Sequence, residues 1–350
     1  MSSSLLSALN GFVTKFHRWS YELGLSERKE LPVSTFSVGN ISFGGTGKTP
    51  FTAWLCRTLK DMNHSPAVLT RGYGREDEDA LVVVHDGRRL RANTATAGDE
   101  PVLLADKLGD VPVVACADRY KAGRMILKKR EIDVAVLDDG MQHYRLARQG
   151  EIVLLDSTRE YFGPRAGETL LREPLSALSR AHLIVLTRCE DSPKFQRLHK
   201  EIIRLNPGIP VVRTRFVPEE LKPVQVGGDW ADSRKPGKVV LAAGIGNPDS
   251  FARLMEKSGF TVVGKNWLKD HAAITPSDVR RWMQERKRRG AEAVVVTEKD
   301  AVKLREFKKL PQNLWYCPIR LEFLSSREEE IARRVIKARM QIKPIAGYLK

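Results

Sequence analysis

The fold is decided by the stretch Phe36-Ser37-Val38-Gly39-Asn40-Ile41-Ser42-Phe43-Gly44-Gly45-Thr46-Gly47-Lys48-Thr49. A hydrophobic run leads into a glycine-dense turn, and a helical pattern follows from Pro50 to Leu59. This order of strand, turn and helix is typical of a phosphate loop, in which glycines let backbone N–H groups approach phosphate oxygens. The helix N-terminus adds a partial positive charge. The stretch therefore predicts a nucleotide-binding site.

The expected phosphate loop consists of Ser42, Phe43, Gly44, Gly45, Thr46, Gly47, Lys48 and Thr49. In such a loop Lys48 reaches the β- and γ-phosphates, and the Thr49 hydroxyl binds Mg²⁺. The usual pattern G-x-x-x-x-G-K-[ST] has glycine where this chain has Ser42, so we expect Gly44 and Gly45 to make the sharp turn. The alternative is a generic glycine-rich turn, but the motif, the strand and the helix all agree.

Composition places the chain among globular proteins with anionic partners. Its 350 residues suffice for one large or two modest domains, and 42% of them are hydrophobic. The four cysteines form no C-x-x-C pair, which favours a reducing compartment over a disulfide framework or a zinc site. The net charge of +16 favours nucleic acid, anionic lipid or phosphorylated substrates. Neither a run of about 18 apolar residues, which a spanning helix needs, nor a signal peptide is apparent.

Strands alternate with helical patterns from Pro32 onward, which predicts an α/β fold with a mostly parallel sheet covered by helices on both faces. The strands expected for this sheet are 33–38, 67–70, 111–116, 133–137, 151–155 and 183–187. The expected organisation is an N-terminal amphipathic helix over 1–25, a nucleotide-binding domain over 26–212, a linker over 213–236, a second, smaller α/β domain over 237–325 and a basic helix over 326–350.

The N-terminal segment 1–25 repeats apolar residues at helical spacing, with Lys15, His17 and Arg18 beside that face. One interpretation is a helix that lies in a membrane interface, with cations near anionic lipid. The other is a helix that packs on the protein's own core. The pattern alone does not separate them.

Two adjacent acids, Asp138 and Asp139, end the apolar run 133–137. A carboxylate at a strand end is the expected partner of a phosphate loop, where it holds Mg²⁺ directly or through water. The alternative is a strand-to-turn cap, since Asp-Gly is common in turns. Beside a Gly-Lys-Thr loop, metal binding is the stronger interpretation.

Further polar residues follow the predicted strands and helices. Arg71 and Tyr73 lie in a glycine-containing turn, where an arginine suits phosphate recognition but also suits a solvated turn. The remaining substrate candidates are Gln142, His143, Arg172 and Glu173. Asp99 is either a helix N-cap or a catalytic acid or base, and an Asp–His pair with His271 could deprotonate an alcohol for attack on phosphorus.

At these motifs the chain resembles the tetraacyldisaccharide 4′-kinase family, the lipid A kinases of Gram-negative bacteria. The matching stretches, in family order, are 38–40 with 44–50, 70–75, 98–101, 137–143, 171–175 and 297–303. The resemblance implies transfer of the ATP γ-phosphate to the 4′-hydroxyl of an acylated glucosamine disaccharide 1-phosphate, with Mg²⁺. It also implies a two-domain fold and an N-terminal helix docked on the cytoplasmic face of the inner membrane, as a peripheral or monotopic protein.

By the same resemblance, Lys48 and Thr49 serve phosphate and Mg²⁺, Asp138 and Asp139 serve the metal, and Asp99 with His271 forms the catalytic pair. Two departures stand out. Ala272 replaces the family's usual second histidine, and the stretch 161–169 lacks its usual Gly-Asn-Gly-Arg pattern. Any role of the second imidazole is therefore absent here or supplied elsewhere. The altered stretch leaves open which residues contact the acceptor and which acyl chains are preferred.

Two other classes of protein compete with a kinase. One is a nucleotide-driven switch or a metal-insertion ATPase, which uses the same loop but needs no Asp99–His271 pair. The other is a nucleic-acid binder, which the basic charge permits, but no stacking-aromatic motif supports it.

Overall fold

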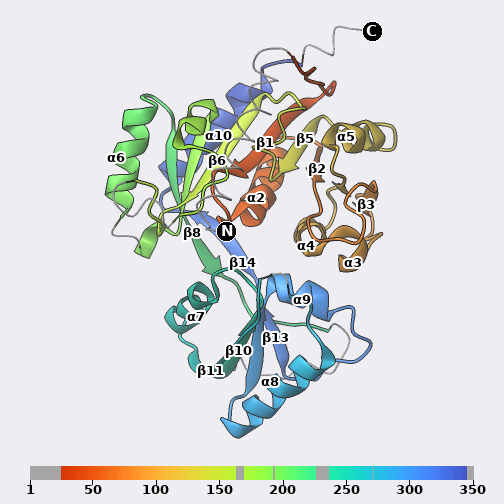
Figure 1. Ribbon diagram of the computed structural model, residues 1–350, viewed down its shortest axis with the longest axis vertical. Helices are drawn as coiled ribbons and strands as arrows, with labels where there is room; N and C mark the ends of the chain where they lie inside the picture. Colours follow the sequence, from red (N-terminus) through yellow and green to blue (C-terminus); the bar gives the residue numbers. More distant parts are fainter. Residues whose placement is uncertain (1–24, 163–168, 192–193, 226–235, 271, 345–350) are drawn as a thin grey trace, which may run out of the picture.

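The structure is a computed structural model that describes residues 25–162, 169–191, 194–225, 236–270 and 272–344. Within these ranges the chain folds into two helix-flanked sheets, which we call the first lobe and the second lobe (Figure 1). The expected fold class, a mostly parallel sheet covered by helices with a second, smaller α/β unit, is confirmed. The expected N-terminal helix over 1–25 lies almost entirely outside the described residues.

The first lobe contains a nine-stranded sheet in the order β14-β8-β7-β6-β1-β5-β2-β4-β3. Its strands are β1 (Ser34–Asn40), β2 (Pro66–Thr70), β3 (Val82–His85), β4 (Val113–Ala115), β5 (Val134–Asp138), β6 (Gly150–Asp156), β7 (Leu183–Thr187), β8 (Val211–Pro218) and β14 (Ile319–Phe323). The seven strands from β8 to β4 run parallel, and the two edge strands run antiparallel. The inner strands β1, β5, β6 and β7 are buried along their whole length, which explains the continuous apolar runs of β5, β6 and β7.

Helices cover both faces of this sheet. They are α2 (Lys48–Asp61), α3 (Thr94–Ala97), α4 (Asp99–Leu108), α5 (Arg119–Leu127), α6 (Phe195–Leu205) and α10 (Ser326–Met340), with the 3₁₀ turns η2 (Leu175–Arg180) and η3 (Cys189–Asp191). On one face the buried side chains of α2, α4 and α10 form one core with the sheet. On the other face α5 and α6 close two smaller cores.

The second lobe contains a five-stranded sheet in the order β11-β10-β12-β13-β9. Its strands are β9 (Lys222–Pro223), β10 (Lys238–Ala243), β11 (Thr261–Trp267), β12 (Ala293–Thr297) and β13 (Leu314–Cys317), and its helices are α7 (Pro248–Lys257), α8 (Pro276–Arg288) and α9 (Glu298–Leu304). Figure 1 shows α9 facing the first lobe below α4, and α7 below β8.

The lobe boundary differs from the expected one. The segment 213–236, expected as a linker, contributes most of β8 to the first sheet and β9 to the second. The prolines of this segment are compatible with the sheets, because Pro218 ends a strand and Pro223 lies in an edge strand, where a missing N–H is tolerated. Pro318 likewise separates β13 from β14, which returns to the first sheet although 237–325 was expected to be one unit.

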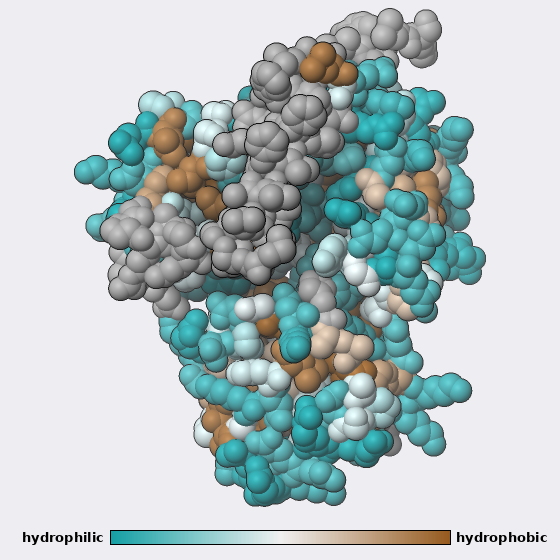
Figure 2. All heavy atoms as spheres, in the orientation of Figure 1, coloured by the Kyte–Doolittle hydropathy of each residue, from teal (hydrophilic) through white to brown (hydrophobic). Residues whose placement is uncertain are grey.

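The molecular surface agrees with the composition. The face shown in Figure 2 is mostly hydrophilic on both lobes, with scattered hydrophobic patches. Among the described residues, no helix is long and apolar enough to cross a membrane.

Candidate functional site

The loop between β1 and α2 has the geometry of a phosphate-binding turn. Gly44 and Gly47 adopt φ angles of +86° and +90°, which side chains other than glycine rarely adopt. Gly47 comes directly before the first residue of α2, Lys48. The expectation that Gly44 makes a sharp turn fits this backbone, but Gly47, and not Gly45, is the second glycine with positive φ.

The neighbouring strands hold this loop in place. The Asn40 side chain donates a hydrogen bond to Thr46 Oγ1 at 2.9 Å, and Thr187 Oγ1 donates to the Thr46 carbonyl oxygen at 3.1 Å. Ser42 is fully buried, and its hydroxyl lies 3.4 Å from that of Tyr161. The Phe43 ring is 39% exposed and lies against the Arg172 guanidinium. The serine at the position of the usual glycine is therefore part of the loop's packing.

The two acids at the end of β5 meet the start of α2. Lys48 Nζ lies 3.4 Å from Asp139 Oδ1, and Arg172 Nη1 lies 2.8 Å from Asp139 Oδ2. Asp139 has a φ of +54°, which turns its carboxylate toward these cations. Asp138 is buried and accepts a hydrogen bond from Thr52 Oγ1 at 2.8 Å. The predicted metal and phosphate residues therefore lie together at the carboxyl edge of the sheet.

The environment gives these acids different proton affinities. Burial, reinforced by the negative charge of Glu100, raises the pKa of Asp138 to about 7. Burial also acts to raise the pKa of Asp139, but the charges of Lys48 and Arg172 outweigh it and hold that pKa at about 2. Asp139 is therefore ionised at neutral pH, and an added cation beside Asp138 would favour its ionised form.

The donor set suits a magnesium ion that shares its coordination with phosphate. Among the described residues, no group of three or more His, Cys, Asp or Glu side chains could hold a metal by itself. Magnesium usually binds through one or two carboxylates together with substrate phosphates. The Thr49 hydroxyl at the start of α2 and the carboxylates of Asp138 and Asp139 fit that pattern.

A second group of predicted site residues follows Asp139 or lies near it through hydrogen bonds: Gln142, His143 and Glu173. Gln142 Nε2 donates to the Asn40 carbonyl oxygen at 2.9 Å and to Glu173 Oε1 at 2.7 Å. The buried Glu173 also pairs with Arg180 at 2.7 Å. Burial, with the nearby charges of Arg119 and Arg148, lowers the pKa of His143 to about 3, so its imidazole is neutral. These three side chains are already engaged or enclosed within the protein.

The turn after β2 is open to solvent. Arg71 is exposed and pairs with Glu78 at 3.2 Å, while the Tyr73 side chain is 64% exposed. Gly72 packs against Ala97, which places the turn beside the start of α4. Of the six substrate candidates, these two are the ones most accessible to a large acceptor.

Asp99 begins α4 and faces the second lobe. It is only 7% exposed, and its Oδ2 lies 3.4 Å from Lys303 Nζ and 3.7 Å from Lys299 Nζ, both on α9. Lys299 also lies 3.3 Å from Glu100 and 3.7 Å from Asp270. His271 lies outside the described residues, but the residue before it shares Lys299 with Asp99.

Sequence reasoning missed Lys299 and Lys303, although both lie in a stretch that it singled out. The stretch 297–303 entered only as a match to the family, and within it Thr297 caps α9 by accepting the Asp300 N–H. The available signal was the spacing of the two lysines, four residues apart and therefore on one helix face. What that face meets could not be read from spacing.

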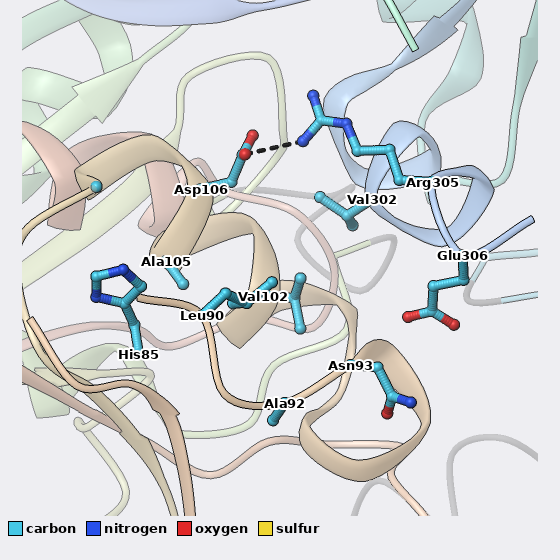
Figure 3. Close-up of a pocket in the computed structure, with 11 residues that line it drawn as sticks. His85, Leu90, Ala92, Asn93, Val102, Ala105, Asp106, Val302, Arg305 and Glu306 are labelled. Carbon is cyan, nitrogen blue, oxygen red and sulfur yellow. Dashed lines mark ion pairs between the residues drawn. The ribbon is translucent and has the colours of Figure 1, made fainter. Parts of the chain in front are cut away.

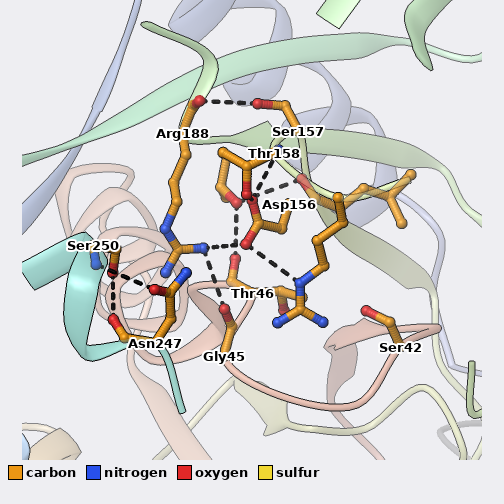
Figure 4. Close-up of polar contacts among 12 residues, drawn as sticks. Ser42, Gly45, Thr46, Asp156, Ser157, Thr158, Arg188, Asn247 and Ser250 are labelled. Carbon is orange, nitrogen blue, oxygen red and sulfur yellow. Dashed lines mark hydrogen bonds and ion pairs between the residues drawn. The ribbon is translucent and has the colours of Figure 1, made fainter. Parts of the chain in front are cut away.

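Sequence reasoning also missed a cluster on the opposite side of the loop (Figure 4). Arg188, directly after β7, pairs with the buried Asp156 at 2.6 Å and donates to the Gly45 carbonyl oxygen at 3.2 Å. Arg159 pairs with the same carboxylate at 3.5 Å and donates to the Phe43 carbonyl oxygen. Polar residues just after buried strands were the signal for this cluster.

A cavity of about 350 Å³ lies apart from the loop, between β3, α4 and α9 (Figure 3). Val102 and Val302 line it from opposite lobes, and the Asp106–Arg305 ion pair lies at 2.8 Å beside them. No residue that the sequence predicted for the site lines this cavity. The predicted site is the loop edge and not this cavity.

Comparisons with known proteins show which proteins this chain is similar to over nearly its whole length. Residues 3–340 match the family model described as tetraacyldisaccharide-1-P 4′-kinase. The tetraacyldisaccharide 4′-kinase of Halothermothrix orenii is 33% identical over 314 residues, which cover 86% of this chain and 82% of the relative. That of Chlorobaculum parvum is 34% identical over 333 residues, which cover 92% and 91%. The "apo" form of LpxK from Aquifex aeolicus, solved in complex with ATP, has a TM-score of 0.73 and 30% identity, with 97% of this chain and 99% of that chain covered.

Proposed function

This chain belongs to the tetraacyldisaccharide-1-P 4′-kinase family, and from that premise we propose how its residues divide the work of phosphoryl transfer. The protein is a lipid A 4′-kinase that transfers the γ-phosphate of ATP to the 4′-hydroxyl of a tetraacylated glucosamine disaccharide 1-phosphate. A nucleotide switch or metal-insertion ATPase is not favoured, because kinases match nearly the whole chain, including the second lobe.

One observation supports the proposed roles most strongly. Lys48, at the N-terminus of α2, lies 3.4 Å from Asp139 at the end of β5, so the phosphate loop and the acids share one edge of the sheet. When a triphosphate binds, Lys48 exchanges this carboxylate for the β- and γ-phosphate oxygens, and the loop N–H groups bind the same phosphates. Phosphoryl transfer depends mainly on such positioning and charge neutralisation.

Thr49, Asp138 and Asp139 are the proposed ligands of Mg²⁺. The fit rests on their oxygen donors and on the buried carboxylate of Asp138. Burial and the charge of Glu100 raise its pKa despite the nearby Lys48, so a bound cation would favour its ionised form. The ion, when bound, neutralises charge that develops on the transferred phosphate. Arg172 keeps Asp139 ionised and oriented, and the hydrogen bond from Thr52 orients one oxygen of Asp138.

Asp99, with His271 as its partner, is the proposed base. The carboxylate accepts the proton of the 4′-hydroxyl while that oxygen bonds to the γ-phosphorus and the bond to the β–γ bridging oxygen breaks, which releases ADP. Lys299 and Lys303 hold the carboxylate in position from the second lobe. The base is therefore assembled by contact between the two lobes.

The six substrate candidates divide into two groups. Arg71 and Tyr73, which are accessible, are the proposed contacts of the acceptor. Gln142 and Glu173 orient each other, Arg172 orients Asp139, and the neutral His143 is largely enclosed by the protein. The second group therefore supports the site from within the protein.

The lipid acceptor requires the enzyme to work at a membrane surface. We propose that residues 1–25 dock the enzyme, as a peripheral or monotopic protein, on the cytoplasmic face of the inner membrane, and that the net charge of +16 assists through anionic lipid. Deleting residues 1–24 should abolish sedimentation with anionic liposomes and leave the melting temperature of the remaining chain unchanged. Unchanged sedimentation would contradict this role.

The direct test offers the full-length protein Mg-ATP and the acylated disaccharide 1-phosphate, and detects the 4′-phosphorylated product by mass spectrometry. Lys48→Ala should lose both ATP binding and product. His271→Ala and Asp99→Asn should lose product and retain ATP binding. If the wild type forms no product, the function fails, and if His271→Ala loses ATP binding and product equally, its role as a catalytic partner fails.

A further inference from the structure

Arg188 has an unusual backbone for its residue type. In the described part of the chain, the non-glycine residues with positive φ are Asn63, Asp139 and Arg188, and the φ of Arg188 is +58°. Such a conformation costs free energy and persists where the surroundings enforce it, often at functional sites. Asp139 is already part of the phosphate site, and Arg188 lies on the opposite side of the same loop.

Three contacts fix the Arg188 side chain and backbone. Its guanidinium pairs with Asp156, which is 1% exposed, and donates to the Gly45 carbonyl oxygen. Its own carbonyl oxygen accepts the Ser157 hydroxyl at 2.9 Å. The guanidinium plane is therefore held next to the phosphate loop, and its side chain keeps 20% exposure.

Phe216 of β8 lies beneath this guanidinium. The Arg188 Cζ is 5.0 Å from the centre of the Phe216 ring, which is the arrangement of a cation–π pair. The ring also lies directly on the backbone of Gly47, because a Cβ added there would be 2.3 Å from Phe216 Cζ. A flat, two-layered surface therefore adjoins the last glycine of the phosphate loop.

The direction of the reaction decides which part of ATP reaches this surface. Transfer is in line, so the acceptor and the leaving ADP lie on opposite sides of the γ-phosphorus. The acids and Asp99 lie on the side of β1 where β5 and β2 are found. Arg188 follows β7 and Phe216 belongs to β8, and both of these strands lie on the other side of β1, beyond β6. The nucleoside therefore extends toward Arg188.

We infer that Arg188, supported by Phe216, is the platform on which the adenine ring of ATP stacks. A guanidinium offers a planar, weakly hydrated face to a nucleobase, and Arg stacking is a common mode of base recognition. Figure 4 shows Asn247 and Ser250, at the start of α7, facing Arg188 from the second lobe. The second lobe thus bounds the platform. This inference rests on the proposed function, because it needs ATP on the Lys48 loop.

The test compares ADP with inorganic pyrophosphate, which shares the phosphates and lacks the base. Calorimetry on the full-length protein with Mg²⁺ should show that Arg188→Ala weakens ADP binding about tenfold and leaves pyrophosphate binding unchanged, since one stacked base contributes about that factor. Arg188→Lys, which keeps the charge for Asp156, should show the same selective loss. The lysine variant therefore provides the test if Arg188→Ala does not fold.

Arg159→Ala is the matched control. Arg159 also contacts Asp156 and a loop carbonyl group, but the stack on Phe216 belongs to Arg188. Loss of Arg159 should therefore weaken ADP and pyrophosphate by the same factor. Equal weakening of both ligands by the Arg188 variants, or no weakening of ADP, would overturn the platform. A wild type that binds neither ligand would instead overturn the proposed nucleotide site, and the platform with it.

Discussion

Replacing Lys299 by methionine should impair proton transfer without preventing ATP binding. The Lys299 ammonium lies within 3.7 Å of Asp99, Glu100 and Asp270. Burial acts to lower the pKa of Lys299, but these carboxylates outweigh it and raise that pKa, so the side chain is charged at neutral pH. The variant keeps most of the apolar stem and leaves the three acids to repel one another.

The size of the effect follows from the charges and distances. Unit charges 3.7 Å apart interact by about 4.5 kcal/mol at an effective dielectric constant of about 20. Lys303 remains at 3.4 Å from Asp99, and solvent and side-chain rearrangement screen the change, so we expect about 1.5 kcal/mol to be felt at Asp99. This free energy corresponds to a shift of about one pH unit, because one unit equals about 1.4 kcal/mol.

The assay is the pH dependence of kcat/KM for lipid phosphorylation. In Lys299→Met the acid limb should move upward by about one pH unit, because the carboxylate that accepts the proton is harder to ionise. Lys299→Arg keeps the charge and should restore the wild-type limb. The Kd for ATP should be unchanged in both variants, since Lys299 lies on the acceptor side of the loop.

Lys107→Met is the matched control for damage to the lobe contact. Lys107 of α4 pairs with Glu298 of α9 at 2.6 Å, so its loss removes a lobe-to-lobe ion pair and leaves Asp99 untouched. This variant should lower stability without moving the acid limb. If both methionine variants reduce kcat/KM alike and neither moves the acid limb of the pH profile, Lys299 only joins the lobes. That result would refute the proposed effect of Lys299 on the ionisation of Asp99.

Three further predictions concern the loop, the metal and the sheet. Asp138→Asn should reduce Mg²⁺-dependent turnover at least about a hundredfold and leave the melting temperature equal or higher, because a buried carboxylate is replaced by a neutral amide; full turnover would exclude Asp138 as a ligand. Gly47→Ala should lower the free energy of unfolding in urea by about 1–3 kcal/mol, through its positive φ and the Phe216 ring, and wild-type stability would contradict the loop geometry. Burial lowers the pKa of His182 to about 4, so its neutral form stabilises the fold fully above about pH 6.5 and that contribution is lost as the pH falls toward 4. The urea midpoint of the wild type should fall more steeply over that window than that of His182→Gln, and parallel curves would refute the assignment.

Local patterns predicted the parts of the site that one chain segment supplies. The strand, loop and helix around Lys48 are contiguous in the chain. The strand and the helix each show their characteristic pattern of hydrophobic residues, so the sequence could predict the three together. Asp138 and Asp139 could be predicted because adjacent parallel strands end at one edge, and β1 does pair with β5. The register places Asp138 opposite Val38, which lies two residues before Asn40, the last residue of β1.

Contacts between distant segments could not be predicted in the same way. Phe216 lies in the segment that we expected to be a linker. Local sequence does not reveal that this segment pairs with β14, which is about a hundred residues away along the chain. Nothing in local spacing indicates that Lys299, 200 residues after Asp99, meets it across the lobes. The sequence does not distinguish Arg188 from any other charged residue that follows a strand. Its positive φ occurs among contacts with three other segments, which contain Gly45, Ser157 and Phe216.

Under the proposed roles, these distant contacts place the second lobe beside both ends of the reacting molecules. Its α9 reaches Asp99 on the acceptor side of the loop, and the start of α7 faces Arg188 on the nucleoside side. Both helices pack on one five-stranded sheet, whose buried core joins them into a single body. A displacement of that body would therefore alter the surroundings of the proposed base and of the proposed adenine platform together. For this reason, a change that displaces the whole second lobe should weaken ADP binding and slow phosphorylation together. Lys299→Met leaves the Lys303 and Lys107 contacts between the lobes in place, so it should move the acid limb and leave nucleotide binding unchanged.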